Sequence, residues 1–337
     1  MEINTTVDRE MPQGPSDTVN SLCWSPTGNF LAVAAWDNSV RVYEINPATG
    51  EGQGRFVYQH EAPALSVCWW ADGSKVISGG CDNVLRCYDV ATGQSSVVGQ
   101  HDMAITGVCL VDVGMPMVAS VSLDRTLRYW NLTSPQPVAT VALPERGYAV
   151  CSAQKLLVAS CANKQIVLIN LESPQNIYKT QDSPLKYQTQ AIACQSTGAG
   201  YAAGSVEGRC AIQYLNPTGT ASNFTFRCHR KQVGTTAKPV EEVYPVTAVT
   251  FHPQFLSLVT AGADGVFHLW DTESRRRICY SKPLNDPVNA ICFNAQGTLL
   301  AYATGYDWSK GFQFAKPGVG GVVRVRKVEE WEVKSKR

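Results

Sequence analysis

The chain has 337 residues, with 29 lysines and arginines against 28 aspartates and glutamates, and a net charge of +1. This balance excludes a chain-wide basic surface for nucleic acid and also an acidic tail. Hydrophobic residues make up 44% of the chain and charged residues only 17%, so the composition predicts a folded, strand-rich protein.

The N-terminal segment MEINTTVDREMPQGPSD is polar and acidic, and it lacks the apolar core of a secretory signal. No stretch approaches the run of about 18 apolar residues that a membrane span requires. The 12 cysteines form no C-x-x-C pair and mostly lie in apolar runs such as SLCW and AICF. Thiols of this kind are typical of reduced, buried cysteines, so we expect an intracellular protein without a membrane span.

A unit of about 40 to 45 residues recurs along the chain. The segment VNSLCWSPTGNFLAVAAWDNSVRVYEI from Val19 returns as ALSVCWWADGSKVISGGCDNVLRCYDV from Ala64 and as VTAVTFHPQFLSLVTAGADGVFHLWDT from Val246. Further copies begin at Ile105, Tyr148, Ala191 and Val288. A period of this length that ends in a WD-like dipeptide is typical of the blades of a WD-repeat propeller.

Each unit predicts three strands, with a tight turn after the first and an acidic turn after the second. The residues that mark this second turn are Asp37, Asp82, Asp124 and Asp264, with Asn163 and Glu207 in the weaker units. Six residues later stand Tyr43, Tyr88, Trp130 and Trp270, with Ile169 in the fourth unit.

In strong WD repeats, the aspartate of this turn joins a Trp, a Ser or Thr, and a His before the first strand in a hydrogen-bonded set that locks the blade. One complete set is His101, Ser120 or Ser122, Asp124 and Trp130. A partial set is His60, Asp82 and Tyr88. We therefore interpret these His and Asp residues as structural.

The repeats predict an all-β fold, a single seven-bladed WD-repeat β-propeller that spans residues 1–337. The blades are expected near residues 19–45, 64–90, 105–132, 148–171, 191–230, 246–272 and 288–328. Closure requires an outer strand for the last blade, and the segment around Ile3 to Val7 is the candidate.

One repeat carries an insertion. The markers Glu207 and Asp264 are 57 residues apart, whereas the earlier markers are 39 to 45 apart. The surplus lies within residues 216–244. Its middle, NFTFRCHR, predicts an outer strand with Arg227 and His229 on one face, and the following QVGTTAKPVEE predicts a turn-forming loop.

The sequence contains no H-E-x-x-H, no G-x-S-x-G and no glycine pattern for phosphate or dinucleotide binding. Cys228 and His229 are adjacent, but neighbouring residues on a strand point to opposite faces and do not converge on one ion. We therefore expect no enzyme activity, no cofactor and no metal.

Two features are not explained by the blade pattern, and the first is the cationic cluster of the inserted strand. It comprises Arg227, His229, Arg230 and Lys231. The cluster is either a docking site for acidic side chains or phosphate, or a charged edge that prevents strand pairing.

The second feature is the loop YDWSKG of the last unit, in which Trp308 stands near Lys310. An exposed Trp beside a Lys is typical of an interface anchor, and the alternative is a Trp folded back onto its own blade. Trp36 stands directly before the marker Asp37, and it is a candidate contact residue on the same rim of the propeller as Trp308.

Several strings carry a specific resemblance: LPERGY (143–148), SPLKYQTQ (183–190), GSVEGRCAIQYLNP (204–217), NFTFRCHR (223–230) and YDWSKG (306–311). Through them the chain resembles the Rae/Gle family of nucleoporin-associated mRNA-export WD-repeat factors over nearly its whole length. The related checkpoint WD-repeat protein that partners the Bub kinases shares SPLKYQT, EGR and the FRCHR-like strand. LPERGY and YDWSKG favour the export factors.

The resemblance implies a propeller that binds a short acidic hairpin segment, called GLEBS, of an FG nucleoporin. Glutamates of the hairpin are expected at Arg209, Arg227 and Arg230, with Trp36 as a further contact on the same face. The YDWSKG loop resembles the region that the family uses for nucleic acid and for viral inhibitors that mimic it.

The leading hypothesis is therefore a non-enzymatic scaffold at the nuclear pore that takes part in mRNA export from the nucleus. We expect it in the nucleus and at the nuclear envelope, with some in the cytoplasm. Single-stranded RNA or messenger ribonucleoprotein is a further candidate partner. The alternative hypothesis is a mitotic spindle-checkpoint adaptor that binds GLEBS-type segments of kinetochore kinases.

Overall fold

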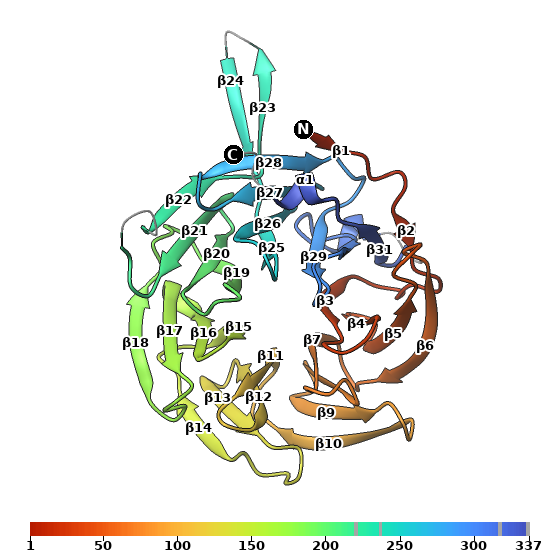
Figure 1. Cartoon of the computed structure of the whole chain (residues 1–337), viewed down its shortest axis with the longest axis vertical. Helices are drawn as coiled ribbons and strands as arrows, with labels where there is room; N and C mark the ends of the chain where they lie inside the picture. The colour runs from red at the N-terminus through yellow and green to blue at the C-terminus, as the bar shows by residue number, and fades with distance from the viewer. Residues whose placement is uncertain (219–221, 236–237, 316–318, 335–337) are drawn as a thin grey trace.

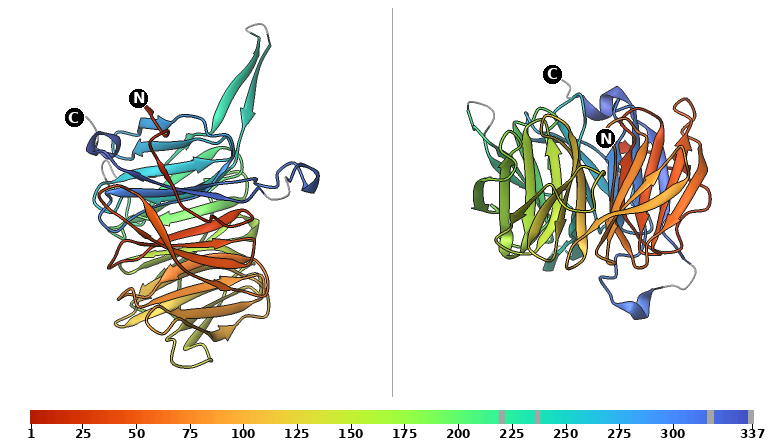
Figure 2. Two further views of the ribbon diagram at one scale, coloured as in Figure 1. Left: turned by 90° about the vertical axis from the view of Figure 1, so that its right-hand side faces the viewer. Right: turned by 90° about the horizontal axis from the view of Figure 1, so that it is seen from below.

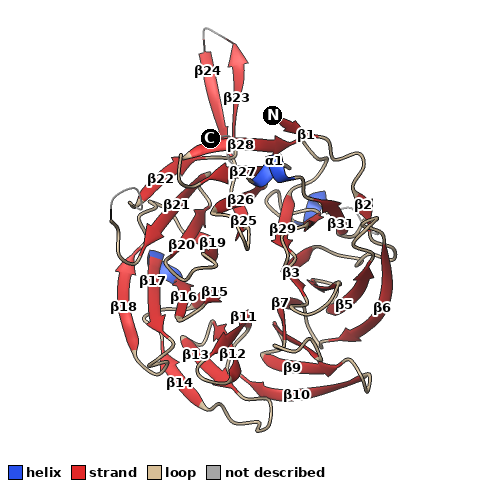
Figure 3. Ribbon diagram, in the orientation of Figure 1, coloured by secondary structure: helices blue, strands red, loops and turns tan. Residues whose placement is uncertain are grey.

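The computed structural model describes residues 1–218, 222–235, 238–315 and 319–334. Seven sheets stand around a central channel like the blades of a propeller (Figure 1), and strands dominate the chain (Figure 3). This arrangement confirms the predicted seven-bladed β-propeller.

Each blade adds a fourth, outer strand to the three strands that the repeats predict. Blades one to three consist of β3 (Val19–Trp24), β4 (Phe30–Ala35), β5 (Ser39–Ile45) and β6 (Gly52–Gln59); β7 (Ala64–Trp69), β8 (Lys75–Gly80), β9 (Val84–Asp89) and β10 (Gln94–Gln100); and β11 (Ile105–Asp112), β12 (Pro116–Ser122), β13 (Thr126–Trp130) and β14 (Ala139–Ala142). Blades four and five consist of β15 (Gly147–Ala153), β16 (Leu156–Cys161), β17 (Gln165–Asn170) and β18 (Ile177–Asp182); and β19 (Thr189–Cys194), β20 (Gly200–Ser205), β21 (Arg209–Tyr214) and β22 (Phe224–Arg227). Blade six contains β25 (Val246–Phe251), β26 (Ser257–Gly262), β27 (Phe267–Asp271) and β28 (Arg276–Ser281), and blade seven contains β29 (Val288–Phe293), β30 (Leu299–Thr304) and β31 (Val322–Lys327).

The remaining elements lie outside this scheme. They are β1 (Glu2–Ile3), β2 (Arg9–Glu10), the hairpin strands β23 (Arg230–Thr235) and β24 (Lys238–Val243), the helix α1 (Glu330–Val333), and two short 3₁₀ helices at Ala162–Lys164 and Phe312–Phe314. No helix in the described part of the chain is long and apolar enough to cross a membrane.

The hydrophobic core lies between neighbouring blades. The second strand of a blade is buried on both faces, so FLAVAA in β4 is apolar almost throughout. Val40 of blade one packs in one cluster with Trp69 and Val76 of blade two. Because no blade buries its faces alone, each one depends on its two neighbours for stability.

The N-terminal segment closes the ring, but not as the sequence predicts. β2 pairs with β31 and completes blade seven, whereas β1 pairs in parallel with β28 as a fifth strand of blade six. The prediction that residues around Ile3 to Val7 close the last blade is therefore wrong. Ile3 is 1% exposed and packs against Val259 and Leu269 of blade six, so burial of this side chain holds the first residues there.

The chain enters every blade on the same side of the propeller, because four antiparallel strands return it to that side. The connections between blades and the turns between second and third strands therefore share one face, which we name the connecting face. The loop between β30 and β31 projects from this face, and the β23–β24 hairpin extends outward from the rim (Figure 2). This hairpin replaces the turn-forming loop that QVGTTAKPVEE predicts.

Candidate functional site

Three blades carry a complete or partial hydrogen-bonded lock. His101 Nδ1 lies 2.8 Å from Asp124 Oδ2, and its Nε2 lies 2.8 Å from Ser120 Oγ. Trp130 Nε1 donates to the same Ser120 oxygen at 2.8 Å. His60 makes the same two contacts in blade two, to Asp82 at 2.8 Å and to Ser78 at 2.7 Å. These contacts confirm that the residues are structural and select Ser120 over Ser122.

His229 forms the third lock, in blade six, and the prediction that it contacts a partner is wrong. Its Nδ1 lies 2.9 Å from Asp264 Oδ1, its Nε2 lies 2.9 Å from Thr260 Oγ1, and its side chain is 0% exposed. Trp270 Nε1 donates to Thr260 at 3.0 Å. His229 has φ 50°, which ends the strand alternation that predicts a shared face with Arg227.

Burial and hydrogen bonds together set the charge states of His101 and Asp124 in the lock of blade three. Desolvation lowers the pKa of His101, so the neutral imidazole is favoured. Burial alone opposes ionisation of Asp124, but hydrogen bonds from Thr126 and His101 outweigh it and the pKa of Asp124 is lowered. The aspartate is therefore ionised and the histidine neutral at neutral pH.

We expect acid to destabilise the protein through the buried His268. Desolvation lowers the pKa of His268 to about 2, below the value of about 6.5 for the unfolded chain. The unfolded state then binds more protons, so this contribution to stability is complete above about pH 7 and is lost by about 1.4 kcal/mol per pH unit below about pH 6.5. Thermal melts between pH 7.5 and pH 5 should show this slope, and His268→Phe should reduce it. An identical slope in this variant would contradict the assignment.

The structure brings two predicted arginines together at the outer edge of blade five. Arg209 of β21 and Arg227 of β22 are directly opposite each other in the antiparallel register. Arg209 Nε lies 3.7 Å from Glu207 Oε2, and Arg227 is exposed without an ion pair to any residue that the structure describes. Like charges directly opposite each other destabilise a sheet, so this pair is suited to an acidic partner.

Arg230 lies beside this pair but is already engaged. Its Nη2 donates to the Glu207 carbonyl at 2.9 Å, and its Nη1 lies 2.6 Å from Glu241 Oε2 on the facing hairpin strand. Arg230 therefore fastens the base of the hairpin to the turn after β20. We name Arg209, Arg227 and Arg230 the arginine edge, in which Arg227 has the most accessible charge. Lys231 is exposed, with Glu242 opposite it in the register.

A second cluster of predicted residues lies at the mouth of the central channel. Trp36 and Trp308 line the same cavity of about 1210 Å³, on the connecting face. Trp308 is 42% exposed and Trp36 is 41% exposed, so Trp308 is not a core residue of its own blade. Lys310 belongs to the same loop and is exposed.

The loop is held by its own side chains. Tyr306 donates its hydroxyl to the Gly311 carbonyl at 2.8 Å, and Asp307 Oδ1 accepts hydrogen bonds from Ser309. The rings of Tyr306 and Trp308 lie 5.6 Å apart. Trp308 has φ 59°, a left-handed conformation that is uncommon for a bulky residue and is often associated with function.

Sequence reasoning missed the residues that join the two tryptophans. Trp36 N donates to the Thr18 carbonyl at 2.9 Å, and Thr18 Oγ1 donates to the Tyr306 carbonyl at 2.7 Å. Thr18 thus links the turn of blade one to the loop of blade seven. No local pattern marks this contact, because Thr18 and Tyr306 are 288 positions apart.

The repeated blades and their locks define a WD-repeat propeller. The WD domain, G-beta repeat family matches residues 9–44, 53–89 and 238–271. The chain is 42% identical to the Poly(A)+ RNA export protein of Schizosaccharomyces pombe, over 97% of this chain and 92% of the relative. It is 42% identical to mRNA export factor GLE2 of Chaetomium thermophilum, over 91% and 86%, and 37% identical to Protein Rae1 of Drosophila melanogaster, over 93% and 92%.

The chain therefore belongs to the family of WD-repeat mRNA export factors. This membership confirms the resemblance that LPERGY and YDWSKG indicate.

Proposed function

We propose that the protein is a non-enzymatic scaffold that binds the acidic GLEBS-type hairpin of an FG nucleoporin and takes part in mRNA export at the nuclear pore. It acts in the nucleus and at the nuclear envelope, with some of the protein in the cytoplasm. The observation that carries this proposal is the like-charged pair of the partly buried Arg209 and the exposed Arg227, which lies beside a projecting hairpin in a chain of the export-factor family.

The docking follows from the geometry of the arginine edge. Arg209 and Arg227 lie on one side of the sheet, so two carboxylates of an acidic hairpin reach them together. A carboxylate between them removes their mutual repulsion and accepts charge-assisted hydrogen bonds. Arg230 joins the contact when a partner carboxylate replaces Glu241, and Trp36 supplies apolar area on the connecting face.

Affinity purification of the tagged protein, followed by mass spectrometry, tests the proposal. Interphase cells should yield an FG nucleoporin, and Arg227→Glu should lose it while the protein stays at its normal level. Recovery of kinetochore kinases from mitotic cells, without a nucleoporin in interphase, would instead support the checkpoint adaptor.

We also propose that the outer side of the Trp308 loop contacts single-stranded RNA. Trp308 offers an exposed ring for stacking, worth roughly 1 to 3 kcal/mol per base, and the exposed Lys310 attracts phosphate. Trp308→Ala should weaken binding of a single-stranded RNA, and Lys310→Ala should flatten its salt dependence. Both should leave the melting temperature and the affinity for the nucleoporin unchanged. A large fall in melting temperature with unchanged RNA affinity would contradict this role.

A further inference from the structure

The cavity at the mouth of the channel carries negative charge only. Asp17 and Asp307 line it, and none of its described lining residues is a Lys, Arg or His. Neither carboxylate forms an ion pair within the described parts of the chain. The cavity therefore attracts a cation and repels a phosphate. The arginine edge and the outer side of the Trp308 loop have the opposite preference, since their charged side chains are basic.

Two indole rings line the same cavity as these carboxylates. Trp36 comes from blade one and Trp308 from blade seven, and both remain exposed within the cavity lining. The face of a Trp ring attracts a cation, and a planar guanidinium also stacks on it. A cavity lined by two indoles and two carboxylates favours a positively charged side chain over a neutral one.

Hydrogen bonds hold the backbone at Trp36 and Tyr306 and the carboxylate of Asp307 before any ligand arrives. Thr18, next to Asp17, bonds to both Trp36 and Tyr306. Asp307 is fixed by two hydrogen bonds from Ser309, at 3.1 and 2.6 Å. A site that needs little ordering loses less affinity to conformational entropy.

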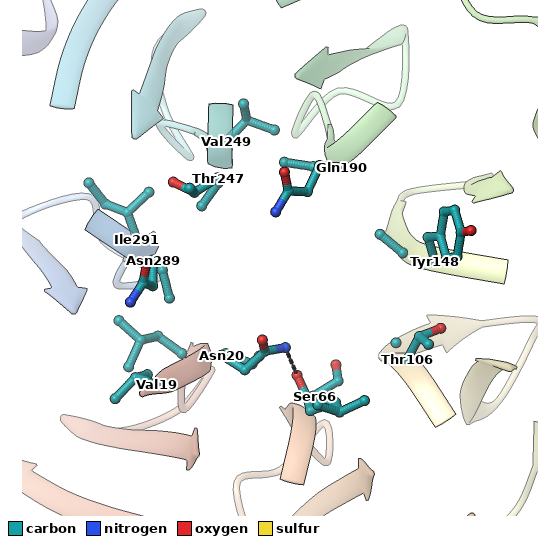
Figure 4. Close-up of a pocket in the computed structure, with 18 of the residues that line it drawn as sticks. Val19, Asn20, Ser66, Thr106, Tyr148, Gln190, Thr247, Val249, Asn289 and Ile291 are labelled. Carbon is teal, nitrogen blue, oxygen red and sulfur yellow. Dashed lines mark hydrogen bonds between the residues drawn. The ribbon is translucent and has the colours of Figure 1, made fainter. Parts of the chain in front are cut away.

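Neutral polar side chains surround the channel below the mouth. Asn20, Tyr148, Gln190 and Asn289 come from four different blades and surround an open centre (Figure 4). Asn20 donates its amide N–H to the Leu65 carbonyl at 2.6 Å, and Asn289 donates to the Gly305 carbonyl at 3.1 Å. Their amide oxygens are thereby left to accept hydrogen bonds, which suits a donor-rich group such as a guanidinium.

We propose that this mouth pocket, formed by Asp17, Trp36, Asp307 and Trp308, binds an arginine side chain presented by an exposed segment of a partner protein. The guanidinium stacks between the indoles and pairs with the carboxylates, and the neutral ring below accepts its remaining N–H groups. None of the three arginines of the arginine edge belongs to this site, and Trp36 is the one residue that it shares with the proposed hairpin contact.

Tryptophan indole NMR signals of the isotope-labelled full chain test this directly. The protein has eight tryptophans, and Trp36→Phe and Trp308→Phe assign the two relevant signals. The probes are the blocked pentapeptides Gly-Ser-Arg-Ser-Gly and Gly-Ser-Gln-Ser-Gly. The arginine peptide should shift these two signals and leave the others in place, with an affinity at least roughly fivefold above that of the glutamine peptide. Equal shifts with both peptides, or no shift at millimolar peptide, would overturn the proposal.

Charge-neutral variants separate this site from RNA binding. Asp17→Asn with Asp307→Asn keeps the local hydrogen bonds but should weaken the arginine peptide roughly fivefold or more, because the cation loses both partners. The same variant should leave the affinity for RNA unchanged or raise it. Lys310→Ala should lower the affinity for RNA without lowering the affinity for the arginine peptide. The control is Asp286→Asn, an exposed residue before β29 outside the pocket. If the control and the double variant reduced the affinity for the arginine peptide equally, the proposed site would be contradicted.

Discussion

Replacing Arg209 and Arg227 together with glutamate should weaken binding of an acidic GLEBS-type hairpin by about 10²-fold or more. Losing one charge-assisted partner from a desolvated interface costs about 2 to 5 kcal/mol, and here two neighbouring partners become repulsive. Their side chains lie at a sheet edge, so the free energy of unfolding should change by less than about 1 kcal/mol. Titration calorimetry at fixed salt measures the affinity, and a thermal melt measures the stability.

A matched control changes the same net charge elsewhere. Lys155 and Lys179 are exposed in blade four, and their replacement by glutamate should leave hairpin affinity nearly intact. A hairpin whose glutamates are exchanged for lysines should bind the Arg209→Glu, Arg227→Glu variant better than the original hairpin does. Equal losses in both double variants would show that only overall charge matters.

Removing the Trp130 side chain should destabilise the protein far more than any of the surface substitutions. Trp130 is 0% exposed, bonds Ser120 within the lock and packs so closely on Gly99 that a Cβ there would lie 2.1 Å from its ring. Trp130→Ala should lower the free energy of unfolding by about 3 to 5 kcal/mol, since it leaves a large cavity. Trp130→Phe keeps an aromatic ring at this position and should lower the free energy of unfolding by less. Its effect comes from the lost hydrogen bond and a smaller cavity.

Trp36→Ala is the matched control for this prediction. It removes the same side chain from an exposed turn, so the free energy of unfolding should change by less than about 0.5 kcal/mol. Urea unfolding of the three variants gives the comparison. Similar losses for Trp130→Ala and Trp36→Ala would mean that the lock contributes little to blade stability.

The blades could be predicted from the sequence because their signals are local. A marker aspartate and a residue with left-handed backbone shape each acidic turn, as with Asn38 at φ 67° and Gly265 at φ 73°, and both lie next to the turn in sequence. Two-residue strands such as β1 and β2 carry no periodicity. Tertiary contacts of Ile3 and Asp8 decide where they pair, so the closing strand was misplaced.

His229 was misassigned because an insertion separates it from its blade. His60 and His101 precede their first strands by four residues, whereas His229 precedes Val246 by 17, with the β23–β24 hairpin between them. A signal was present: Asp264 had a Trp six residues later but no His at the usual position. His229 is the histidine that supplies this lock.

The arginine edge could be predicted only in part. Sequence gives the charges of Arg209, Arg227 and Arg230, but Glu241, the partner that engages Arg230, lies on a strand that reads as a turn-forming loop. The acidic mouth pocket was not predicted, because Asp17 and Asp307 line one cavity only when the first and last blades close the ring.

The central claim, that the protein binds an acidic nucleoporin hairpin through the arginine edge, is tested most directly by titration calorimetry of the purified chain with a GLEBS-type segment of an FG nucleoporin. We expect one segment per chain, a Kd below about 1 μM, and an affinity that falls as salt is raised, because the contact is charge-assisted. No measurable binding, or binding that is unchanged in the Arg209→Glu, Arg227→Glu variant, would contradict the account.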